Sequence, residues 1–284
     1  MLVTDSIDEI RSAVRLWKRE KLSVAFVPTM GALHEGHLAL IRQARREADR
    51  VVVSIFVNPE QFGPDEDYDR YPRRPDDDLK FCQKSRVSAV FMPDTSTIYP
   101  DEPVFSIGLN GLNRHMCGKS RPGFFEGVVL VVNKLFNIIE PDIALFGQKD
   151  IQQYLILERM AREFNHGVKL VMGRTIRAGD GLALSSRNAY LSNDERLLAP
   201  SLYRALTWVA RQIEGGVHEP SLLITHQREE LEAKGFRIDY FNLYDWKRIE
   251  PVDRLVAGER YILAGAVFLG STRLIDNVLI DYQP

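Results

Sequence analysis

The sequence predicts a doubly wound α/β domain with a parallel sheet, followed by a smaller C-terminal α+β domain. Short runs of apolar, β-branched and aromatic residues alternate with longer segments of helical periodicity in the first part of the chain. Runs that are apolar at every position are typical of strands covered on both faces, and strands joined by helices pair in parallel through right-handed crossovers. The alternation ends near residue 176, where a second domain is expected to begin.

The apolar runs expected to form the strands of the first domain are residues 24–27, 51–57, 89–92, 142–146 and 168–172. The helical segments between them are residues 36–49, 76–85, 126–139 and 150–164. In the second domain, helices at 194–214 and 219–234 are followed by strands at 237–243, 260–267 and 273–280. Short connections between these last strands predict an antiparallel sheet. The predicted domains are therefore residues 1–175 and 176–284.

Composition and charge exclude several classes of protein. The formal net charge of −2 over 284 residues lacks the basic excess of nucleic-acid-binding proteins. Two cysteines, Cys82 and Cys117, form no C-x-x-C pair, which argues against a disulfide scaffold or a cysteine-rich metal site. The chain shows neither a membrane-spanning apolar run nor the apolar core of a signal peptide. We therefore expect a cytoplasmic protein that binds neither membrane nor nucleic acid.

The most informative segment is residues 28–37, which read Pro-Thr-Met-Gly-Ala-Leu-His-Glu-Gly-His. This segment joins the first predicted strand to the first predicted helix through a turn that contains Gly31 and Gly36. A helix that starts after such a turn directs backbone N–H groups and the positive end of its dipole at a phosphate. His34 and His37 add side-chain N–H donors. We therefore expect the turn to bind a nucleotide polyphosphate and to stabilise charge at a reacting phosphoryl group.

Other interpretations of this part of the sequence are less well supported. The zincin motif places its two histidines at positions i and i+4 of one helix, whereas His34 and His37 are three residues apart and have no evident third ligand. No protein metal site is therefore expected. Residues 118–120 end like a Walker A loop, but Asn113 stands where its first glycine should be. The phosphates must be held in another way.

Two further segments carry groups suited to phosphate. Lys149 follows Gly147 at the end of a predicted strand, at the start of a predicted helix, and Asp150 is placed to cap that helix or orient a hydroxyl group. Residues 185–187, Ser-Ser-Arg, supply two hydroxyl groups and a guanidinium for α- or β-phosphate oxygens. A helix cap within a surface loop is the alternative interpretation of residues 185–187.

Uncharged amide side chains also follow the predicted strand ends. Asn58, Gln61 and Gln153 are able to hold a hydroxyl or carboxylate group without a tight ion pair that would weaken it as a nucleophile. Ligands of doubly wound folds bind outside the carboxyl ends of the strands. We therefore expect the turns at 31–37, 58–61 and 147–150 to open onto one crevice.

Two acidic runs are interpreted without a catalytic role. Residues 65–69 lack the spacing of a calcium-binding loop, so a solvated loop is expected. Residues 76–78, Asp-Asp-Asp, are expected to serve the N-terminus of the next helix, where negative charge is favourable.

Four of these segments resemble the motifs of the pantothenate synthetase (pantoate–β-alanine ligase) family. They are residues 28–37, residues 56–62 (Phe-Val-Asn-Pro-Glu-Gln-Phe), residues 146–150 (Phe-Gly-Gln-Lys-Asp) with Gln152-Gln153, and residues 180–188 (Asp-Gly-Leu-Ala-Leu-Ser-Ser-Arg-Asn). The motifs occur in the family's order and the resemblance spans nearly the whole chain. An H-x-G-H element alone would indicate only the wider nucleotidyltransferase superfamily.

The resemblance implies a two-step, ATP-dependent reaction. The carboxylate of (R)-pantoate attacks the α-phosphorus of ATP to give pantoyl adenylate and pyrophosphate, and β-alanine then attacks the adenylate to give pantothenate and AMP. The resemblance further implies a homodimer that requires Mg²⁺ bridging the ATP phosphates. Its N-terminal domain is implied to be Rossmann-like and to bind ATP and pantoate, and its C-terminal domain to close over the site.

The resemblance also implies site residues by matching position. Those implied to contact ATP are Met30, Gly31, Ala32, Leu33, His34, Glu35, Gly36, His37, Gly147, Gln148, Lys149, Asp150, Ile176, Leu184, Ser185, Ser186 and Arg187. His37 is the implied proton donor, and we expect His34, Lys149 and Arg187 to stabilise the charge at the reacting phosphate with it. Gln61 and Gln153 are implied to hold pantoate, Gln61 also to meet β-alanine, and Asn58 is expected beside them.

One segment departs from the family pattern. Phe124 and Glu126 occupy positions at which many relatives carry a histidine and a basic residue, so no contact is assigned there. Two other functions remain open at this stage. One is another H-x-G-H adenylyl- or cytidylyltransferase with a different acceptor, and the other is a module that senses ATP without turnover.

Overall fold

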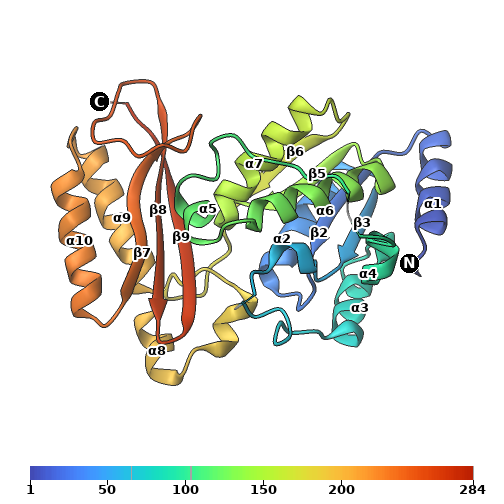
Figure 1. The fold of residues 1–284 in the computed structure, drawn as a ribbon, viewed down its shortest axis with the longest axis horizontal. Helices are drawn as coiled ribbons and strands as arrows, with labels where there is room; N and C mark the ends of the chain where they lie inside the picture. Colours follow the sequence, from blue (N-terminus) through green and yellow to red (C-terminus); the bar gives the residue numbers. More distant parts are fainter. Residues whose placement is uncertain (65, 103, 284) are drawn as a thin grey trace. The chain divides into compact units, whose positions relative to one another are not determined.

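A parallel sheet with strand order β1-β4-β3-β2-β5-β6 forms the centre of the N-terminal part of the chain (Figure 1). Its strands are β1 (Leu2–Thr4), β2 (Val24–Thr29), β3 (Arg50–Ile55), β4 (Ala89–Phe91), β5 (Ile143–Gly147) and β6 (Lys169–Gly173). All neighbouring pairs are parallel. The chain places β3 on one side of β2 and β5 on the other, so the switch in winding direction lies between β2 and β5. The predicted doubly wound α/β fold is confirmed.

The computed structural model describes residues 1–64, 66–102 and 104–283, and the chain packs as two units. Unit 1 comprises Met1–Leu109, Arg121–Gln148 and Gln153–Arg174, and unit 2 comprises Asn110–Ser120, Lys149–Gln152 and Thr175–Pro284. The main boundary falls within one residue of the predicted one. A single division after residue 175 nevertheless misplaces two short segments, residues 110–120 and 149–152, which pack within unit 2.

The physical reason for this difference is a buried amide side chain in unit 2. Gln152 is 3% exposed. Its Nε2 donates to the carbonyl oxygens of Leu112 and His115, each at 2.8 Å, and its Oε1 accepts from the N–H of Gly118 at 3.3 Å. These bonds join residues 110–120 to the segment 149–152, although 30 or more residues separate them along the chain. No local pattern in the sequence reveals such a contact.

Helices cover both faces of the parallel sheet. The helices of this part of the chain are α1 (Ile7–Arg19), α2 (Glu35–Glu47), α3 (Pro75–Lys84), α4 (Thr95–Ile98), α6 (Phe124–Ile139) and α7 (Ile151–Glu163), with the 3-10 turns η1 (Pro59–Gln61) and η2 (Gln148–Asp150). The four helices predicted here are confirmed within about two residues at each end. The strand β1 and the helix α1 were not predicted. Ile7, Ile10, Val14 and Trp17 of α1 recur at helical spacing, a signal that the sequence analysis did not use, and Ile10 and Val14 are buried.

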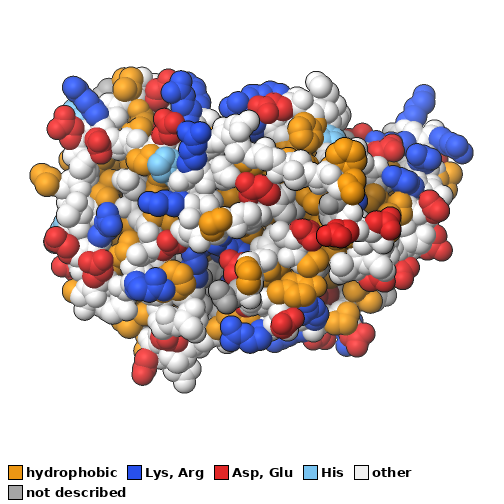
Figure 2. All heavy atoms as spheres, viewed as in Figure 1, with side chains coloured by type: hydrophobic (Ala, Val, Ile, Leu, Met, Phe, Trp, Pro, Cys, Tyr) orange, Lys and Arg blue, Asp and Glu red, His pale blue; other side chains and the backbone are white. Residues whose placement is uncertain are grey.

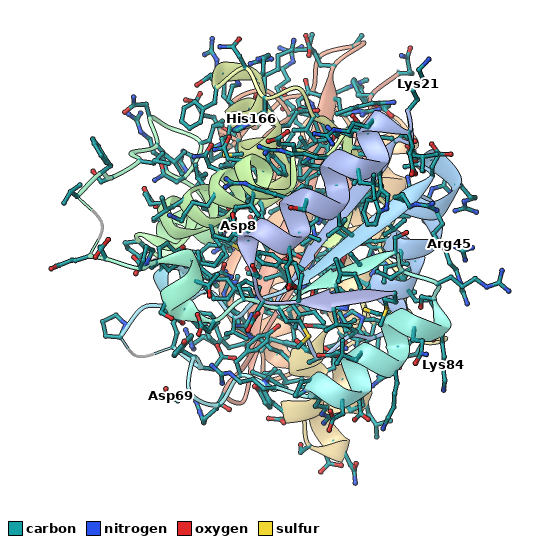
Figure 3. All side chains as sticks on the ribbon, turned by 90° about the vertical axis from the view of Figure 1, so that its right-hand side faces the viewer. Asp8, Lys21, Arg45, Asp69, Lys84 and His166 are labelled. Atoms are coloured by element: carbon teal, nitrogen blue, oxygen red, sulfur yellow. The ribbon has the colours of Figure 1, made fainter. Side chains whose placement is uncertain are left out.

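Alternation along the strands determines which helix packs on which face of the sheet. Ala25 and Val27 of β2 point to the face that contains Ile41 and Ala44 of α2 in one buried cluster. Phe26, which points the other way, meets Phe136 of α6 edge-to-face at a centroid distance of 6.5 Å. Since both faces are covered, the continuous apolar runs of the strands are explained. Figure 3 views this part from the side of α1, with Asp8 near its start and Lys21 just past its end.

Unit 2 is built on an antiparallel sheet with strand order β7-β8-β9. Its elements are α5 (Met116–Ser120), the 3-10 helix η3 (Ser186–Tyr190), α8 (Asn193–Leu198), α9 (Ser201–Glu214), α10 (Ser221–Ala233), β7 (Arg237–Asp245), β8 (Arg260–Leu269) and β9 (Thr272–Asp281). The predicted α+β domain with an antiparallel sheet is confirmed. The single helix predicted at 194–214 is wrong, because Pro200 lacks an N–H group and separates α8 from α9.

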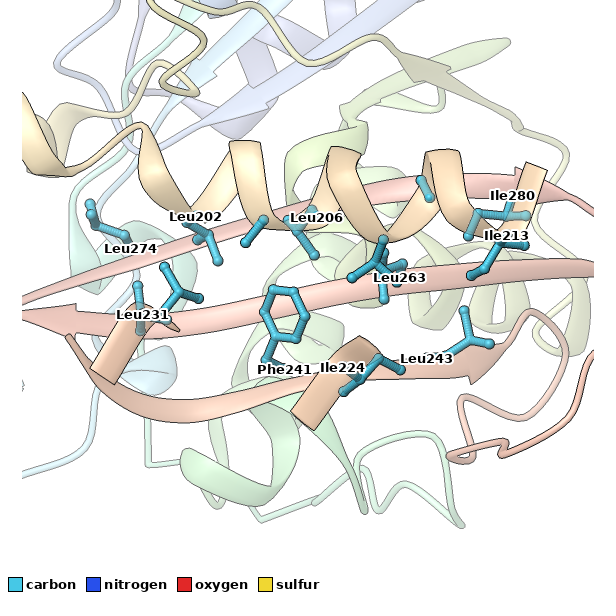
Figure 4. Close-up of a cluster of buried hydrophobic side chains, with 14 of the residues drawn as sticks. Leu202, Leu206, Ile213, Ile224, Leu231, Phe241, Leu243, Leu263, Leu274 and Ile280 are labelled. Carbon is cyan, nitrogen blue, oxygen red and sulfur yellow. The ribbon is translucent and has the colours of Figure 1, made fainter. Parts of the chain in front are cut away.

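The core of unit 2 lies between its sheet and two helices, α9 and α10 (Figure 4). Leu202 and Leu206 of α9 face Phe241 of β7 and Leu263 of β8, all at most 3% exposed. Leu231 of α10 closes the same cluster. A buried side chain of this size contributes about 1.5–3 kcal/mol to stability, so this layer alone accounts for an independent hydrophobic core.

Acidic and basic side chains are interspersed on the face drawn in Figure 2, as expected from the nearly balanced charge. Among the described residues, no helix combines the length and apolar character needed to cross a membrane.

The turn η1 packs directly on α6 at a glycine. A Cβ atom at Gly127 would lie 1.9 Å from the carbonyl oxygen of Glu60 and 2.8 Å from the backbone nitrogen of Gln61. Real Cβ atoms do not approach backbone so closely. Only glycine therefore permits this contact, even though glycine is unfavourable inside a helix.

We predict that Gly127→Ala destabilises the protein by about 1–3 kcal/mol, as overpacking of a core does, and lowers its thermal midpoint. Intrinsic helix propensity would predict the opposite sign, since alanine is favoured over glycine by about 1 kcal/mol in a helix interior. The measurement is thermal unfolding followed by circular dichroism. Gly167→Ala is the matched control, because a Cβ at the exposed Gly167 meets no atom within 4 Å. A midpoint for Gly127→Ala equal to or above that of the control would contradict the prediction.

Candidate active site

The turn that follows β2 has an unusual backbone. Gly31 and Ala32 have φ angles of +82° and +49°, so two successive residues lie in the left-handed region. Glycine adopts this region without strain, whereas alanine does so at a cost of about 1 kcal/mol. A Cβ atom at Gly31 would also lie 2.9 Å from Oδ2 of Asp78 and 3.1 Å from Cγ2 of Ile55. The turn therefore needs glycine at position 31 and some external support at position 32.

Asp78 of α3 provides hydrogen-bond acceptors for this turn. The N–H of Ala32 donates to its Oδ2 at 2.9 Å, and the N–H of Leu33 donates to its Oδ1 at 2.7 Å. Asp78 is 3% exposed, and it faces inward rather than toward solvent. Residues 76–78 lie in the first turn of α3, as predicted, but Asp78 also accepts hydrogen bonds from a turn outside its own helix, which the sequence analysis did not foresee. The N–H groups of Ala32 and Leu33, expected to point at a phosphate, point at this carboxylate instead.

Burial raises the pKa of Asp78 above its ordinary value, although the hydrogen bonds from Leu33 and Ala32 act in the opposite direction. A raised pKa in the folded state means that folding favours the protonated carboxyl group. The contribution of Asp78 to stability consequently falls as the pH rises from the ordinary aspartate range through the raised pKa. Stability alone would therefore favour a neutral group at this position.

His34 and His37 cap the N-terminus of α2 with their own side chains. Nδ1 of His34 accepts from the N–H of Gly36 at 3.1 Å, and Nδ1 of His37 accepts from the N–H of His34 at 3.2 Å. The ring centroids are 4.2 Å apart. In a neutral imidazole whose Nδ1 is an acceptor, the proton resides on Nε2. The structure thus brings together two rings whose Nε2–H groups are donors, at the positive end of a helix.

Asn58 and Gln61 lie together at the carboxyl end of β3, but they have different environments. Nδ2 of Asn58 donates to Oε1 of Gln61 at 3.2 Å and to the carbonyl oxygen of Gly127 at 3.1 Å. Its Oδ1 accepts from the hydroxyl group of Tyr99 at 2.9 Å and from the N–H of Glu60 at 3.3 Å. Two donated and two accepted bonds saturate an amide side chain. Since Asn58 is also 1% exposed, its side chain is engaged within the protein and orients Gln61.

Gln61 itself is oriented from two sides. Its Oε1 accepts from Asn58, and its Nε2 donates to Sδ of Met30 at 3.0 Å. Each of these two atoms retains capacity for a further hydrogen bond. Tyr99, which supports Asn58, was missed by the sequence analysis, because it lies 41 residues away and belongs to no motif.

The acidic run near residue 66 contains an ion pair. The guanidinium of Arg121 donates to both carboxylate oxygens of Glu66 at 2.5 Å and to the carbonyl oxygen of Gln61 at 3.2 Å. The ring centroid of Phe124, which departs from the family pattern, lies 3.6 Å from the guanidinium carbon of Arg121. The expected solvated loop is therefore wrong for Glu66, which has a structural partner. Asp65 lies outside the described residues.

The remaining predicted residues of unit 1 lie near the switch in strand order. Gly147 ends β5, which pairs with β2, the strand that precedes the histidine turn. Gln148 follows Gly147, and Gln153 lies in the first turns of α7. Both glutamines are half-buried. Doubly wound folds bind ligands at the carboxyl ends of strands beside this switch, so the position agrees with the predicted ligand crevice.

Unit 2 contains the other predicted ATP contacts. Nζ of Lys149 lies 3.5 Å from a carboxylate oxygen of Asp150, and the carbonyl oxygen of Lys149 accepts from Nδ2 of Asn277 at 3.0 Å. The N–H of Leu184 donates to the carbonyl oxygen of Ile176 at 2.9 Å, so these two predicted residues are neighbours. Asp150 was expected either to cap the following helix or to orient a hydroxyl group; no capping hydrogen bond is found among the bonds described for it, and the second role stays a prediction.

Residues 185–187 form the start of η3. Ser185 is its N-cap and accepts from the N–H of Arg187 at 3.3 Å. The alternative interpretation of this segment as a helix cap is therefore correct for Ser185. Since the cap uses the hydroxyl oxygen as an acceptor, its O–H remains able to donate to another group. Ser186 and Arg187 follow it within the first turn of η3.

An ion pair missed by the sequence analysis supports this region of unit 2. Arg177 donates to both carboxylate oxygens of Asp276, which is 5% exposed. The guanidinium of Arg177 also lies 3.5 Å from the ring centroid of Tyr203. The pair joins the hairpin that contains Ile176 and Leu184 to β9. Its two members are 99 residues apart, so no motif links them.

Among residues 1–64, 66–102 and 104–283, no group of three or more His, Cys, Asp or Glu side chains is arranged to hold a metal ion.

Comparisons with known proteins identify the family of this chain. The family model for pantoate-beta-alanine ligase matches residues 2–279. A pantothenate synthetase of Caldicellulosiruptor saccharolyticus is 44% identical over 99% of this chain and 100% of its own length. The pantothenate synthetase of Bacillus subtilis is 43% identical over 99% of this chain and 97% of its own length.

Solved structures lead to the same result. The crystal structure of a pantothenate synthetase from Thermus thermophilus has a TM-score of 0.91, is 41% identical and is matched over 100% of both chains. A pantoate-beta-alanine ligase from Francisella tularensis, complexed with beta-gamma ATP and beta-alanine, has a TM-score of 0.83 at 32% identity, over 98% of this chain and 97% of its own. The family model matches nearly the whole chain, and the relatives from Caldicellulosiruptor saccharolyticus and Thermus thermophilus are matched over their full length. This chain therefore belongs to the pantoate–β-alanine ligase family.

Proposed function

We propose that this ligase makes pantothenate in two steps and that the first, adenylation of (R)-pantoate by ATP, takes place at the turn bearing His34 and His37. The observation that carries the proposal is the pair of imidazole rings whose Nδ1 atoms are both occupied by backbone N–H groups. The family's solved relative from Francisella tularensis, which was complexed with beta-gamma ATP and beta-alanine, supports the choice of ATP and β-alanine as substrates.

In the first step, a pantoate carboxylate oxygen attacks the α-phosphorus of ATP. A P–O bond forms, the bond to the β-phosphate bridging oxygen breaks, and pyrophosphate leaves. Negative charge increases on the oxygens around the α-phosphorus in the transition state. The Nε2–H groups of His34 and His37, together with the N-terminus of α2, are suited to stabilise that charge without a change in protonation.

In the second step, the amine of β-alanine attacks the acyl carbon of the adenylate. A C–N bond forms, the mixed anhydride bond breaks, AMP leaves with the bonding electron pair, and the amine loses a proton. We assign the binding of pantoate to the free hydrogen-bonding capacity of Gln61, with Gln153 as a second amide. An amide side chain holds a hydroxyl or carboxylate group by hydrogen bonds without lowering its nucleophilicity. A tight ion pair with a cationic side chain would lower it.

Unit 2 supplies further groups in this proposal. Lys149 and Arg187 are cations suited to the phosphates, and Ser185 and Ser186 offer hydroxyl groups. ATP enters as its Mg²⁺ complex, in which the phosphate oxygens hold the ion, and no step is routed through a protein metal ligand. We further propose a homodimer, as the family resemblance implies, and a cytoplasmic location, as the cysteine usage and composition of the sequence indicate.

The experiment that tests the function supplies ATP, Mg²⁺, (R)-pantoate and β-alanine, and omits each in turn. Pyrophosphate release should require ATP, Mg²⁺ and pantoate, and pantothenate with AMP should appear only when β-alanine is added. A panel of other carboxylic acids is the control for the alternative of a different acceptor. The proposal fails if (R)-pantoate releases no more pyrophosphate than buffer does. ATP binding without any turnover would instead support the sensing alternative.

We predict that His37→Asn lowers the rate of pantoyl adenylate formation by about 100–1,000-fold, the usual effect of losing one transition-state donor. The asparagine retains an oxygen able to accept from the N–H of His34, so the helix cap is preserved while the distal N–H donor is lost. The measurement is pyrophosphate release with ATP and (R)-pantoate. His226→Ala is the control, since His226 is exposed on α10 and should leave the rate unchanged. Near-normal turnover by His37→Asn would remove His37 from the mechanism.

We predict that Tyr99→Phe raises the KM for pantoate about 3–10-fold and leaves the KM for ATP unchanged. Loss of the hydroxyl group removes one bond to Oδ1 of Asn58, a loss of about 1 kcal/mol that loosens the support of Gln61. Steady-state kinetics with each substrate varied in turn provide the measurement. The matched control is Tyr154→Phe, which removes a hydroxyl group bonded to Glu158 at 3.2 Å on α7. Equal effects of the two variants on both KM values would show that Asn58 and Gln61 are not specifically involved.

A further inference from the structure

We propose that Asp78 is a positioning residue for adenylation, because its carboxylate fixes the turn at residues 31–33 and thereby the orientation of His34 and His37. The inference rests on the proposed function of the two histidines. It concerns a side chain of α3 that belongs to none of the four motifs on which the family resemblance depends.

The contact is bidentate and lies within unit 1. Each carboxylate oxygen of Asp78 accepts one N–H of the turn, from Ala32 at 2.9 Å and from Leu33 at 2.7 Å. Two adjacent backbone donors held by one rigid group define both the position and the rotation of the peptide between them. His34 follows immediately, and its own N–H donates to Nδ1 of His37. A displacement of the turn would therefore also displace both imidazole rings, because one peptide unit joins Leu33 to His34.

The turn needs this support because of its backbone conformation. Ala32 has a φ angle of +49°, which a residue with a Cβ atom rarely adopts. The N–H groups of successive residues in such a conformation converge and form a concave site for an anion. The Asp78 carboxylate occupies that site. Removal of this acceptor takes away the two hydrogen bonds that offset the cost of the left-handed conformation at Ala32.

A purely structural role for Asp78 is less consistent with its surroundings. Burial raises the pKa of Asp78, so the ionised carboxylate is less favourable for folding than a neutral group. The side chain of its neighbour Asp77 is 72% exposed and lies 3.8 Å from Lys80, so that residue provides the ordinary surface charge at this helix start. A carboxylate that is buried although burial disfavours its ionised form is typical of a functional position.

The test compares Asp78→Asn with Asp77→Asn, which makes the same chemical change one residue earlier on α3. An asparagine at position 78 retains one acceptor and directs an N–H₂ group at a backbone N–H. We expect kcat for pyrophosphate release to fall about 100-fold, as displacement of catalytic groups by about 1 Å does, with the KM for pantoate changed less than threefold. Asp77→Asn should remain within twofold of the parent protein in both constants.

The second readout is ¹⁵N NMR of histidine-labelled protein, in which the chemical shifts of Nδ1 and Nε2 report the tautomer. The signals of His34 and His37 are assigned from His34→Asn and His37→Asn. In Asp78→Asn these two signals should shift or broaden, whereas the other four histidines and all six in Asp77→Asn should not. Unchanged signals of His34 and His37, or a kcat within threefold of the parent, would overturn the proposal.

A rescue experiment separates positioning from general destabilisation. Ala32→Gly removes the penalty for positive φ, so in the Asp78→Asn background it should restore kcat at least threefold. No recovery in the double variant would count against the proposal. Where Asp78→Asn does not fold, Asp78→Ser replaces it under the same criteria, since its hydroxyl group accepts one bond and its O–H is free to rotate away.

Failure of the function and failure of this inference are distinguishable. If the parent protein released no pyrophosphate from ATP and pantoate, the proposed function would fail, while the histidine spectra of Asp78→Asn and Asp77→Asn would still test the positioning role. If the parent protein were active and the spectra were unaffected by Asp78→Asn, only the role of Asp78 would be refuted.

Discussion

The N-terminus of α2 depends on hydrogen bonds that the protein makes to itself. Backbone N–H groups at such a position are usually regarded as ligands for phosphate, yet here Ala32 and Leu33 donate to a carboxylate, and Gly36 donates to an imidazole. These bonds occupy three backbone N–H groups, which are then not available to a ligand. In return they define where the imidazole rings point and which nitrogen carries the proton. The site consequently presents side-chain donors on a fixed support in place of a bare helix end.

The same principle of support without direct contact holds for the amide cluster. Asn58 has no remaining hydrogen-bonding capacity, and its four bonds reach Gln61, Gly127, Tyr99 and Glu60. The close approach of η1 to α6, which only glycine permits at position 127, is what brings these groups within reach. Asn58 thus orients Gln61 through hydrogen bonds made entirely within the protein.

Much of the fold was predictable because its signals are local. Continuous apolar strands, the helices between them and the antiparallel C-terminal sheet all follow from periodicity within about ten residues. The pairing of His34 with His37 was also accessible, since three residues separate them. Contacts such as Asp78 with Ala32, Tyr99 with Asn58 and Arg177 with Asp276 were not, because their members are 46, 41 and 99 residues apart. Long-range polar contacts carry no periodic signal, which is why the partners of Asp78 and Glu66 were not predicted.

Phe124, at the position where the family resemblance led us to expect a histidine, packs on a cation that supports the site. Its ring lies 3.6 Å from the guanidinium carbon of Arg121, and any planar aromatic ring, including imidazole, is able to cover a guanidinium in this way. Arg121 in turn donates to Glu66 and to the carbonyl oxygen of Gln61. Gln61 is thereby held at its backbone by Arg121 and at its side chain by Asn58. The ring at position 124 therefore belongs to the same group of contacts that fixes Gln61, the residue assigned to pantoate.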